Sequence, residues 1–127
     1  MKRVVFACVL MILTVSFNCL CLHSVTESKN RVTMRLDELS ESFFKNGTNE
    51  KTAAKAAEFE KFWMDEHHTL CRLVRHELLD KITSSVSMLH PLAICGDDGA
   101  FLAEISCCKM LIEEVWNSER PLLRNIF

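Results

Sequence analysis

Apolar residues recur at helical spacing along most of the chain. The first stripe begins after residue 30 and continues at intervals of four, three and four residues, which places its members on one narrow face of a helix. Its members are Val32, Leu36, Leu39 and Phe43. Gly47 follows just after the last of them. It predicts the end of this helix, because glycine readily adopts the left-handed conformation that closes helices.

A second helical region is predicted between Asn49, a residue type that caps helices, and Pro91. Its apolar positions form one stripe at Phe59, Phe62, Trp63, Leu70, Leu73 and Val74, and a second stripe, about 100° further round, at Leu78, Ile82 and Leu89. We expect a kink or break between Asp65 and Glu77, since helices far beyond 25 residues are uncommon in globular domains. The region is expected to end at His90, because a residue before proline is disfavoured in the α conformation.

A last helix is predicted after the turn at Cys95–Gly99, with Asp97 or Asp98 as its N-cap. Its core stripe contains Phe101, Ile105, Cys108, Ile112 and Val115. Asn117–Ser118 predicts its end. Because no strand-type alternation of useful length occurs, the sequence predicts an all-α bundle of three to five helices in a single domain, residues 31–127.

The N-terminal stretch has the pattern of a secretory signal peptide. Two basic residues precede the apolar run Val4–Val15, which is too short to span a bilayer comfortably. Cys19 and Cys21 occupy the −3 and −1 positions of a cleavage site. We therefore predict a signal peptide at residues 1–21 and a flexible, irregular lead-in at residues 22–30.

A retained membrane anchor is the rival interpretation of this stretch. It is disfavoured because Asn18 and His23 interrupt the apolar run before a spanning length is reached. Cleavage would remove Lys2 and Arg3, which lowers the 15 basic residues to 13 against 17 acidic ones. This acidic balance disfavours nucleic acid as a partner and leaves no polybasic membrane patch.

Cleavage would also leave four of the seven cysteines, an even number that predicts two disulfides in a short secreted chain. Neighbouring helix positions point about 100° apart, so Cys107 and Cys108 need separate partners. An antiparallel hairpin of the second and last helical regions favours Cys71–Cys108, and Cys95–Cys107 follows by elimination. Two alternatives stay open: Cys71–Cys107 with Cys95–Cys108, or Cys95 unpaired and free for an intermolecular bond.

The sequon Asn46-Gly47-Thr48 lies in a predicted turn. In a secreted protein this pattern predicts glycosylation of Asn46 on a surface loop.

Metal or catalytic chemistry has little support in the sequence. His67 and Cys71 are four residues apart on a predicted helix, but zinc needs three or four ligands and Cys71 is expected in a disulfide. The segment His76–Asp80 resembles the H-E-x-x-H motif of zinc proteases, with aspartate in place of the second histidine. We expect no catalytic residue, no metal and no cofactor.

The aromatic cluster Phe59, Phe62 and Trp63 is a possible apolar binding surface, although a stripe at this spacing is more often core. Glu66 and Glu77 lie within the same stripe and favour a face that is partly wet, as binding grooves are.

The predicted function is that of a secreted, non-enzymatic binding protein, a helical ligand or effector that acts on an extracellular protein receptor. The predicted architecture resembles that of short-chain helical cytokines, with a signal peptide, amphipathic helices, two bridges and one sequon. One alternative is an extracellular carrier of small hydrophobic molecules, although the paired cysteines of insect odorant-binding proteins are absent. Another is a venom or secretory-fluid toxin. No stable membrane span is expected, and the oligomeric state is left open.

Overall fold

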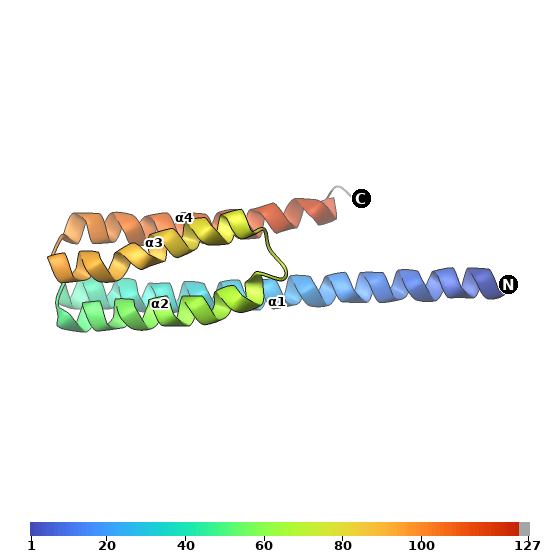
Figure 1. The fold of residues 1–127 in the computed structure, drawn as a ribbon, viewed down its shortest axis with the longest axis horizontal. Coiled ribbons are helices and arrows are strands. Elements are labelled where there is room, and N and C mark those ends of the chain that lie inside the picture. Colours follow the sequence, from blue (N-terminus) through green and yellow to red (C-terminus); the bar gives the residue numbers. More distant parts are fainter. Residues whose placement is uncertain (125–127) are drawn as a thin grey trace.

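The computed structural model describes the backbone of residues 1–124 and the side chains up to Ser118. This part of the chain forms four helices and no strand: α1 (Lys2–Asn46), α2 (Glu50–Leu70), α3 (His76–Cys95) and α4 (Asp98–Arg124) (Figure 1). Consecutive helices run in opposite directions, and each packs against the next. Because α1 also packs against α4, the helices close into an up-down-up-down four-helix bundle. The all-α prediction is confirmed.

The structure confirms three predicted helix ends, at Gly47, Asn49 and Asp97. The Asn49 side chain accepts a hydrogen bond from the Thr52 backbone N–H at 3.0 Å, and the Asp97 carboxylate accepts one from the Ala100 N–H at 3.1 Å. Gly47 ends α1 with a φ of 68°, and Gly96 ends α3 with a φ of 75°. Both conformations are strained for residues that carry a Cβ.

The predicted break in the second helical region falls between α2 and α3, at residues 71–75. Two helix ends differ from the prediction. The helix α3 continues through His90 and Pro91 to Cys95, because Leu89 and Ala93 on either side of the proline are buried in the core while Pro91 itself faces solvent. The helix α4 also extends beyond the predicted end at Asn117–Ser118, to Arg124. Tertiary packing overrides the local preference at Pro91.

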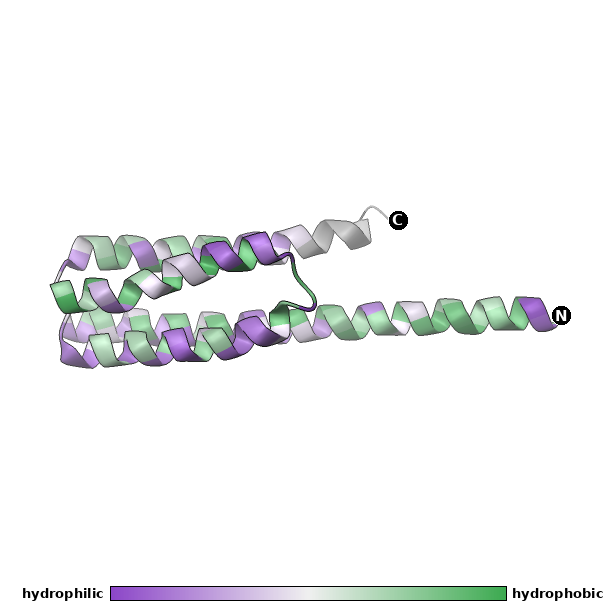
Figure 2. Ribbon diagram, in the orientation of Figure 1, coloured by the Kyte–Doolittle hydropathy of each residue, from purple (hydrophilic) through white to green (hydrophobic). Residues whose placement is uncertain are grey.

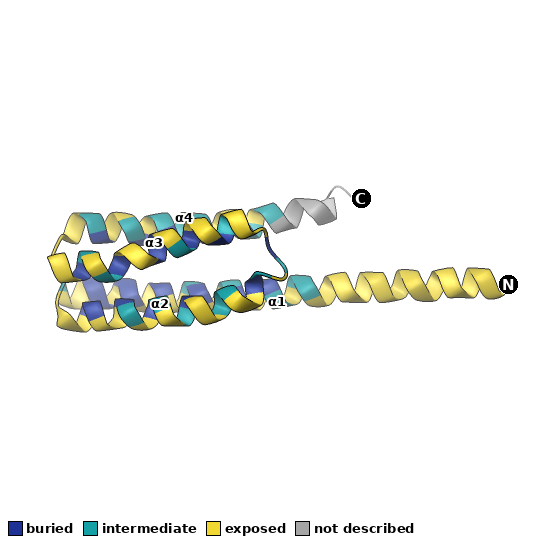
Figure 3. Ribbon diagram, in the orientation of Figure 1, coloured by how far each residue is buried: buried dark blue, intermediate teal, exposed yellow. Residues whose placement is uncertain are grey.

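The segment 22–30 is not an irregular lead-in. It is part of α1, a single helix of 45 residues, and both Val25 and Ser28 are buried against the bundle. The helix projects beyond the bundle toward its N-terminus, where the side chains of residues 1–20 are all exposed (Figures 1 and 3). This projecting part is mostly apolar (Figure 2).

The core runs along the axis of the bundle and contains the predicted stripes of all four helices. Phe43 of α1 and Phe101 of α4 stack with ring centroids 5.1 Å apart at the end distal to the projecting helix. Two ion pairs set the register between these helices: Lys29 with Glu113 at 3.0 Å, and Asp37 with Lys109 at 3.0 Å.

Candidate binding surfaces

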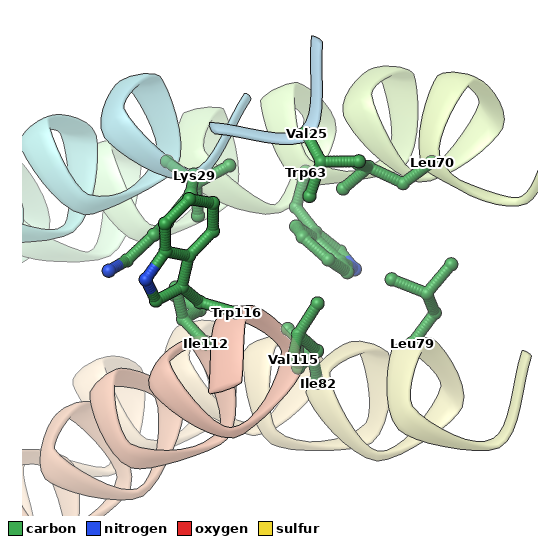
Figure 4. A pocket seen from close by; sticks show the side chains of 10 residues that line it. Val25, Lys29, Trp63, Leu70, Leu79, Ile82, Ile112, Val115 and Trp116 are labelled. Atoms are coloured by element: carbon green, nitrogen blue, oxygen red, sulfur yellow. The ribbon is translucent and has the colours of Figure 1, made fainter. Parts of the chain in front are cut away.

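A cleft lies at the end of the bundle where α1 enters it (Figure 4). Trp63 and Trp116 contribute their rings to its wall, and the Lys29 ammonium lies 5.1 Å from the centroid of the Trp116 ring. The cavity inside the cleft has a volume of about 20 Å³, which is room for roughly one water molecule. Sites for small ligands usually enclose ~300 Å³ or more. The cleft as formed is too small for a carried ligand.

The aromatic cluster that the sequence offered as a possible binding surface belongs mainly to the core. Phe59 is buried, and Trp63 is only 1% exposed and donates its indole N–H to the Thr83 hydroxyl at 2.9 Å. Phe62 is half-buried, with the Arg35 guanidinium 5.2 Å above its ring. The interpretation of this stripe as core is confirmed for Phe59 and Trp63, and neither is available to a partner.

Glu66 does not mark a wet groove. Its side chain is 12% exposed and accepts hydrogen bonds from the Ser28 hydroxyl at 2.7 Å and from the Arg31 guanidinium at 3.2 Å. The carboxylate thus links α2 to α1 and satisfies a fully buried hydroxyl. Glu77, in contrast, is exposed at the start of α3.

The prediction of two disulfides is not supported, because all seven cysteines are free in the structure. Cys71 follows α2 near the end where α1 emerges, whereas Cys108 packs beside Ser85 in the middle of α3. The nine residues from His76 to Ser85 correspond to about 13 Å along α3, and α2 and α4 are diagonal in the bundle. Cys95 is the last residue of α3, whereas Cys107 lies nine residues, about 13 Å, from the start of α4. Without bridges, the resemblance to cytokines is reduced to the helical architecture.

Cys108 is an unreactive core residue. Burial raises the pKa of the Cys108 thiol to about 11, and the nearby Glu104 charge adds to this effect against the opposing hydrogen bond with Ser85. The thiol donates to the Ser85 hydroxyl at 3.2 Å, and that hydroxyl donates in turn to Glu104. The network satisfies three polar groups between α3 and α4.

Cys71, His67 and Asp80 come together beside the α2–α3 loop, but their geometry does not favour proton transfer. The sulfur lies 3.3 Å from Nδ1 and 3.7 Å from Nε2 of His67. Such similar distances place it over the ring face, since a hydrogen bond in the ring plane would leave the far nitrogen at about 5 Å. Asp80 is 4.0 Å from Nε2. Within the described residues, no group of three His, Cys, Asp or Glu side chains is arranged to hold a metal ion.

Asn46 is the last residue of α1 and is exposed. The Thr48 hydroxyl of its sequon donates to the Asp98 carboxylate at 2.5 Å and joins the α1–α2 loop to the start of α4. The sequon therefore lies on the surface, in an ordered turn.

Within the bundle, α1 and α4 carry large exposed apolar side chains that sequence reasoning missed. We define the α1/α4 face as Met34, Phe44, Leu102 and Met110, which are between 37% and 69% exposed. The Asp37–Lys109 pair places Phe44 and Leu102, each one heptad further toward the distal end, opposite each other. Met34 precedes Asp37 by three residues and Met110 follows Lys109, so both are displaced from the pair toward the end from which α1 projects. These residues fall outside the core stripes, and that offset was the available signal.

A protein-family model matches residues 19–126. The chain belongs to this family, DUF4363, a domain of unknown function. No curated protein and no solved structure matches the chain. The DUF4363 match includes the α1/α4 face and the cleft, and it begins within α1 at residue 19, where the projecting apolar part meets the bundle.

Proposed function

We propose that this DUF4363 protein is a non-enzymatic binding protein that is exported across a membrane and docks an extracellular protein through its α1/α4 face. The observation that carries the proposal is the exposure of Met34, Phe44, Leu102 and Met110 on two adjacent helices. Aromatic and methionine side chains are enriched at protein interfaces. Under this proposal the protein acts as a ligand or effector and needs no cofactor.

The size of the face is suitable for a protein partner. Twenty residues of helix are about 30 Å long, and two helices side by side are roughly 20 Å wide, so the face offers about 600 Å² against the ~800 Å² per partner of a standard interface. Covering the four side chains removes about 400 Å² of apolar surface from water, which is favourable by about 10 kcal/mol. Association itself costs ~4–15 kcal/mol. Affinity would therefore depend on polar contacts around Asp37 and Lys109 as well.

Export is supported by the basic Lys2 and Arg3 followed by the exposed apolar part of α1. Glycosylation of Asn46 in a eukaryotic secretory pathway is part of the same proposal. The carrier alternative is not adopted, because the cleft beside Trp63 leaves room for a single water only.

The proposal is tested by placing a photo-crosslinking amino acid at Phe44 or Met110 in cells that express the protein naturally. Met64 and Met88 are matched controls on the other two helices, with exposures of 45% and 48%. We expect the α1/α4 positions to crosslink to a discrete protein on the outer side of the membrane and the control positions to give no such product. Equal crosslinking at all four positions, or at none, would contradict the proposed face.

A further inference from the structure

We infer that the N-terminal part of α1 is retained as a membrane anchor: residues 4–22 span a lipid bilayer and hold the bundle at its outer surface. This inference rests on the proposed export of the protein. It reverses the expectation from sequence that residues 1–21 are removed and that no stable span exists.

The uncharged part of the helix is long enough to span. No Asp, Glu, Lys or Arg occurs between Arg3 and Glu27. Within it, the proposed span of residues 4–22 extends about 29 Å as a helix, close to the hydrocarbon thickness of ~30 Å. An 18-residue window in α1 has a mean hydropathy of 2.5, and none of it is buried within the protein.

The polar residues that favoured a short apolar run do not interrupt this helix. α1 passes through Asn18 and His23 without a break, and no glycine or proline occurs before Gly47. Every internal backbone N–H and C=O of such a segment is paired within the helix, which is the condition for crossing hydrocarbon. The apolar run that ends at Val15 in the sequence is therefore followed by further residues of the same unbroken helix.

The predicted cleavage site is poorly presented to a peptidase. Cys19 and Cys21 lie in the middle of α1, and bulky leucines at positions 20 and 22 alternate with them. A peptidase binds its substrate as an extended strand, so cleavage after Cys21 would require this helix to unwind. Val25, four residues further on, is already buried in the bundle.

Two exposed arginines lie at the end of the bundle beside the anchor, next to the exposed Glu77. The Ser28–Glu66 hydrogen bond sets the register between α1 and α2. Five residues beyond this contact on each helix, the α2–α3 loop is level with His23, at the end from which α1 emerges (Figure 1). Arg72 and Arg75 of this loop are exposed. Their guanidinium groups would lie at the depth of the lipid phosphates, which attract basic side chains.

The direct test is the mass and location of the full chain after expression in a host that exports it. We expect the protein in the membrane fraction, resistant to extraction by alkaline carbonate, with an intact mass that includes residues 1–21. A soluble chain that begins near Leu22 on the outer side would overturn the anchor and leave the proposed function standing. A full-length chain recovered in the soluble cytoplasmic fraction would overturn both.

A variant pair tests the span itself, without dependence on export. Leu13→Arg places a charge at the centre of the proposed span, and Met88→Arg makes the same kind of change on the bundle, away from the α1/α4 face; the two wild-type residues are 63% and 48% exposed. Purified full-length proteins are mixed with phosphatidylcholine–phosphatidylglycerol vesicles and sedimented. Leu13→Arg should lower the bound fraction more than tenfold, because arginine is strongly disfavoured at mid-membrane, and Met88→Arg should leave it unchanged. Equal binding by both variants would rule out residues 4–22 as the membrane-binding segment.

Discussion

Replacing Trp63 by phenylalanine should destabilise the bundle far more than the same replacement at Trp116. Trp63 is buried where α1, α2, α3 and α4 meet, and its indole N–H has a partner in Thr83. Trp116 lies at the rim of the cleft, half-buried, beneath the Lys29 ammonium. Because these are the only two tryptophans, the pair compares one side chain in two environments.

The magnitude for Trp63→Phe follows from three contributions. The lost apolar surface costs about 1 kcal/mol. The missing ring leaves roughly 40 Å³, which at about 24 cal/mol per Å³ costs another ~1 kcal/mol. Loss of the indole hydrogen bond costs about 0.5–1 kcal/mol, since the Thr83 hydroxyl retains its own bond to the Leu79 carbonyl. The sum of about 2–3 kcal/mol corresponds to a fall in Tm of roughly 10–20 °C for a domain of this size.

Thermal unfolding of the full chain in mild detergent, followed by circular dichroism, measures both variants. Trp116→Phe should cost less than about 1 kcal/mol, chiefly through its contact with Lys29. The variant Thr83→Val, alone and combined with Trp63→Phe, isolates the hydrogen bond between the two side chains. A Trp63→Phe protein within 2 °C of wild type, or a larger effect at Trp116, would refute the assignment of Trp63 as the centre of the core.

Three further predictions concern single positions. Gly47→Ala should cost about 1 kcal/mol because of its positive φ, although no atom lies within 4 Å of the added methyl group, whereas Gly99→Ala within α4 should be neutral or slightly stabilising in the same melting experiment. Because the pKa of Cys108 is raised in the folded protein, the thiol of the unfolded chain loses its proton at lower pH. The free energy of unfolding should therefore fall by about 1.4 kcal/mol per pH unit between pH ~9 and ~11. Denaturant titrations of the Cys108→Ala protein at these pH values should show a shallower fall. Asn46→Gln should abolish a glycan-sized mass in protein exported through the secretory pathway of a eukaryotic host and leave Tm unchanged, and loss of export would contradict the surface position of the sequon.

Periodicity and capping chemistry were sufficient to predict the helices but not the contacts between them. Asn49, Asp97 and Gly47 act locally, through bonds within a few residues, so their roles were readable from the chain. Glu66 was misread because its partners, Ser28 and Arg31, lie 38 and 35 residues away. The disulfide pairing was misjudged for a similar reason. A stripe identifies which face of a helix a cysteine lies on, but not its position along the bundle axis or which helix packs against that face. In the closed bundle α2 and α4 are diagonal to each other, and this arrangement depends on the packing of all four helices.

α1 shows how a change of pattern within one helix separates two environments. After Glu27 its buried apolar residues keep to one narrow stripe, with only Met34 and Phe44 outside it, which matches a helix that packs on one side. Before His23 apolar residues occur on every side, and the protein buries none of the first 20 residues. A helix that is apolar all round needs an apolar environment on every side. Sequence reasoning treated the two patterns as separate segments and inserted a flexible linker between them. Because α1 is a single helix, the environment that surrounds its all-apolar N-terminal part fixes the position of the bundle that packs on the rest. Retention or cleavage of residues 1–21 therefore decides where the α1/α4 face can act.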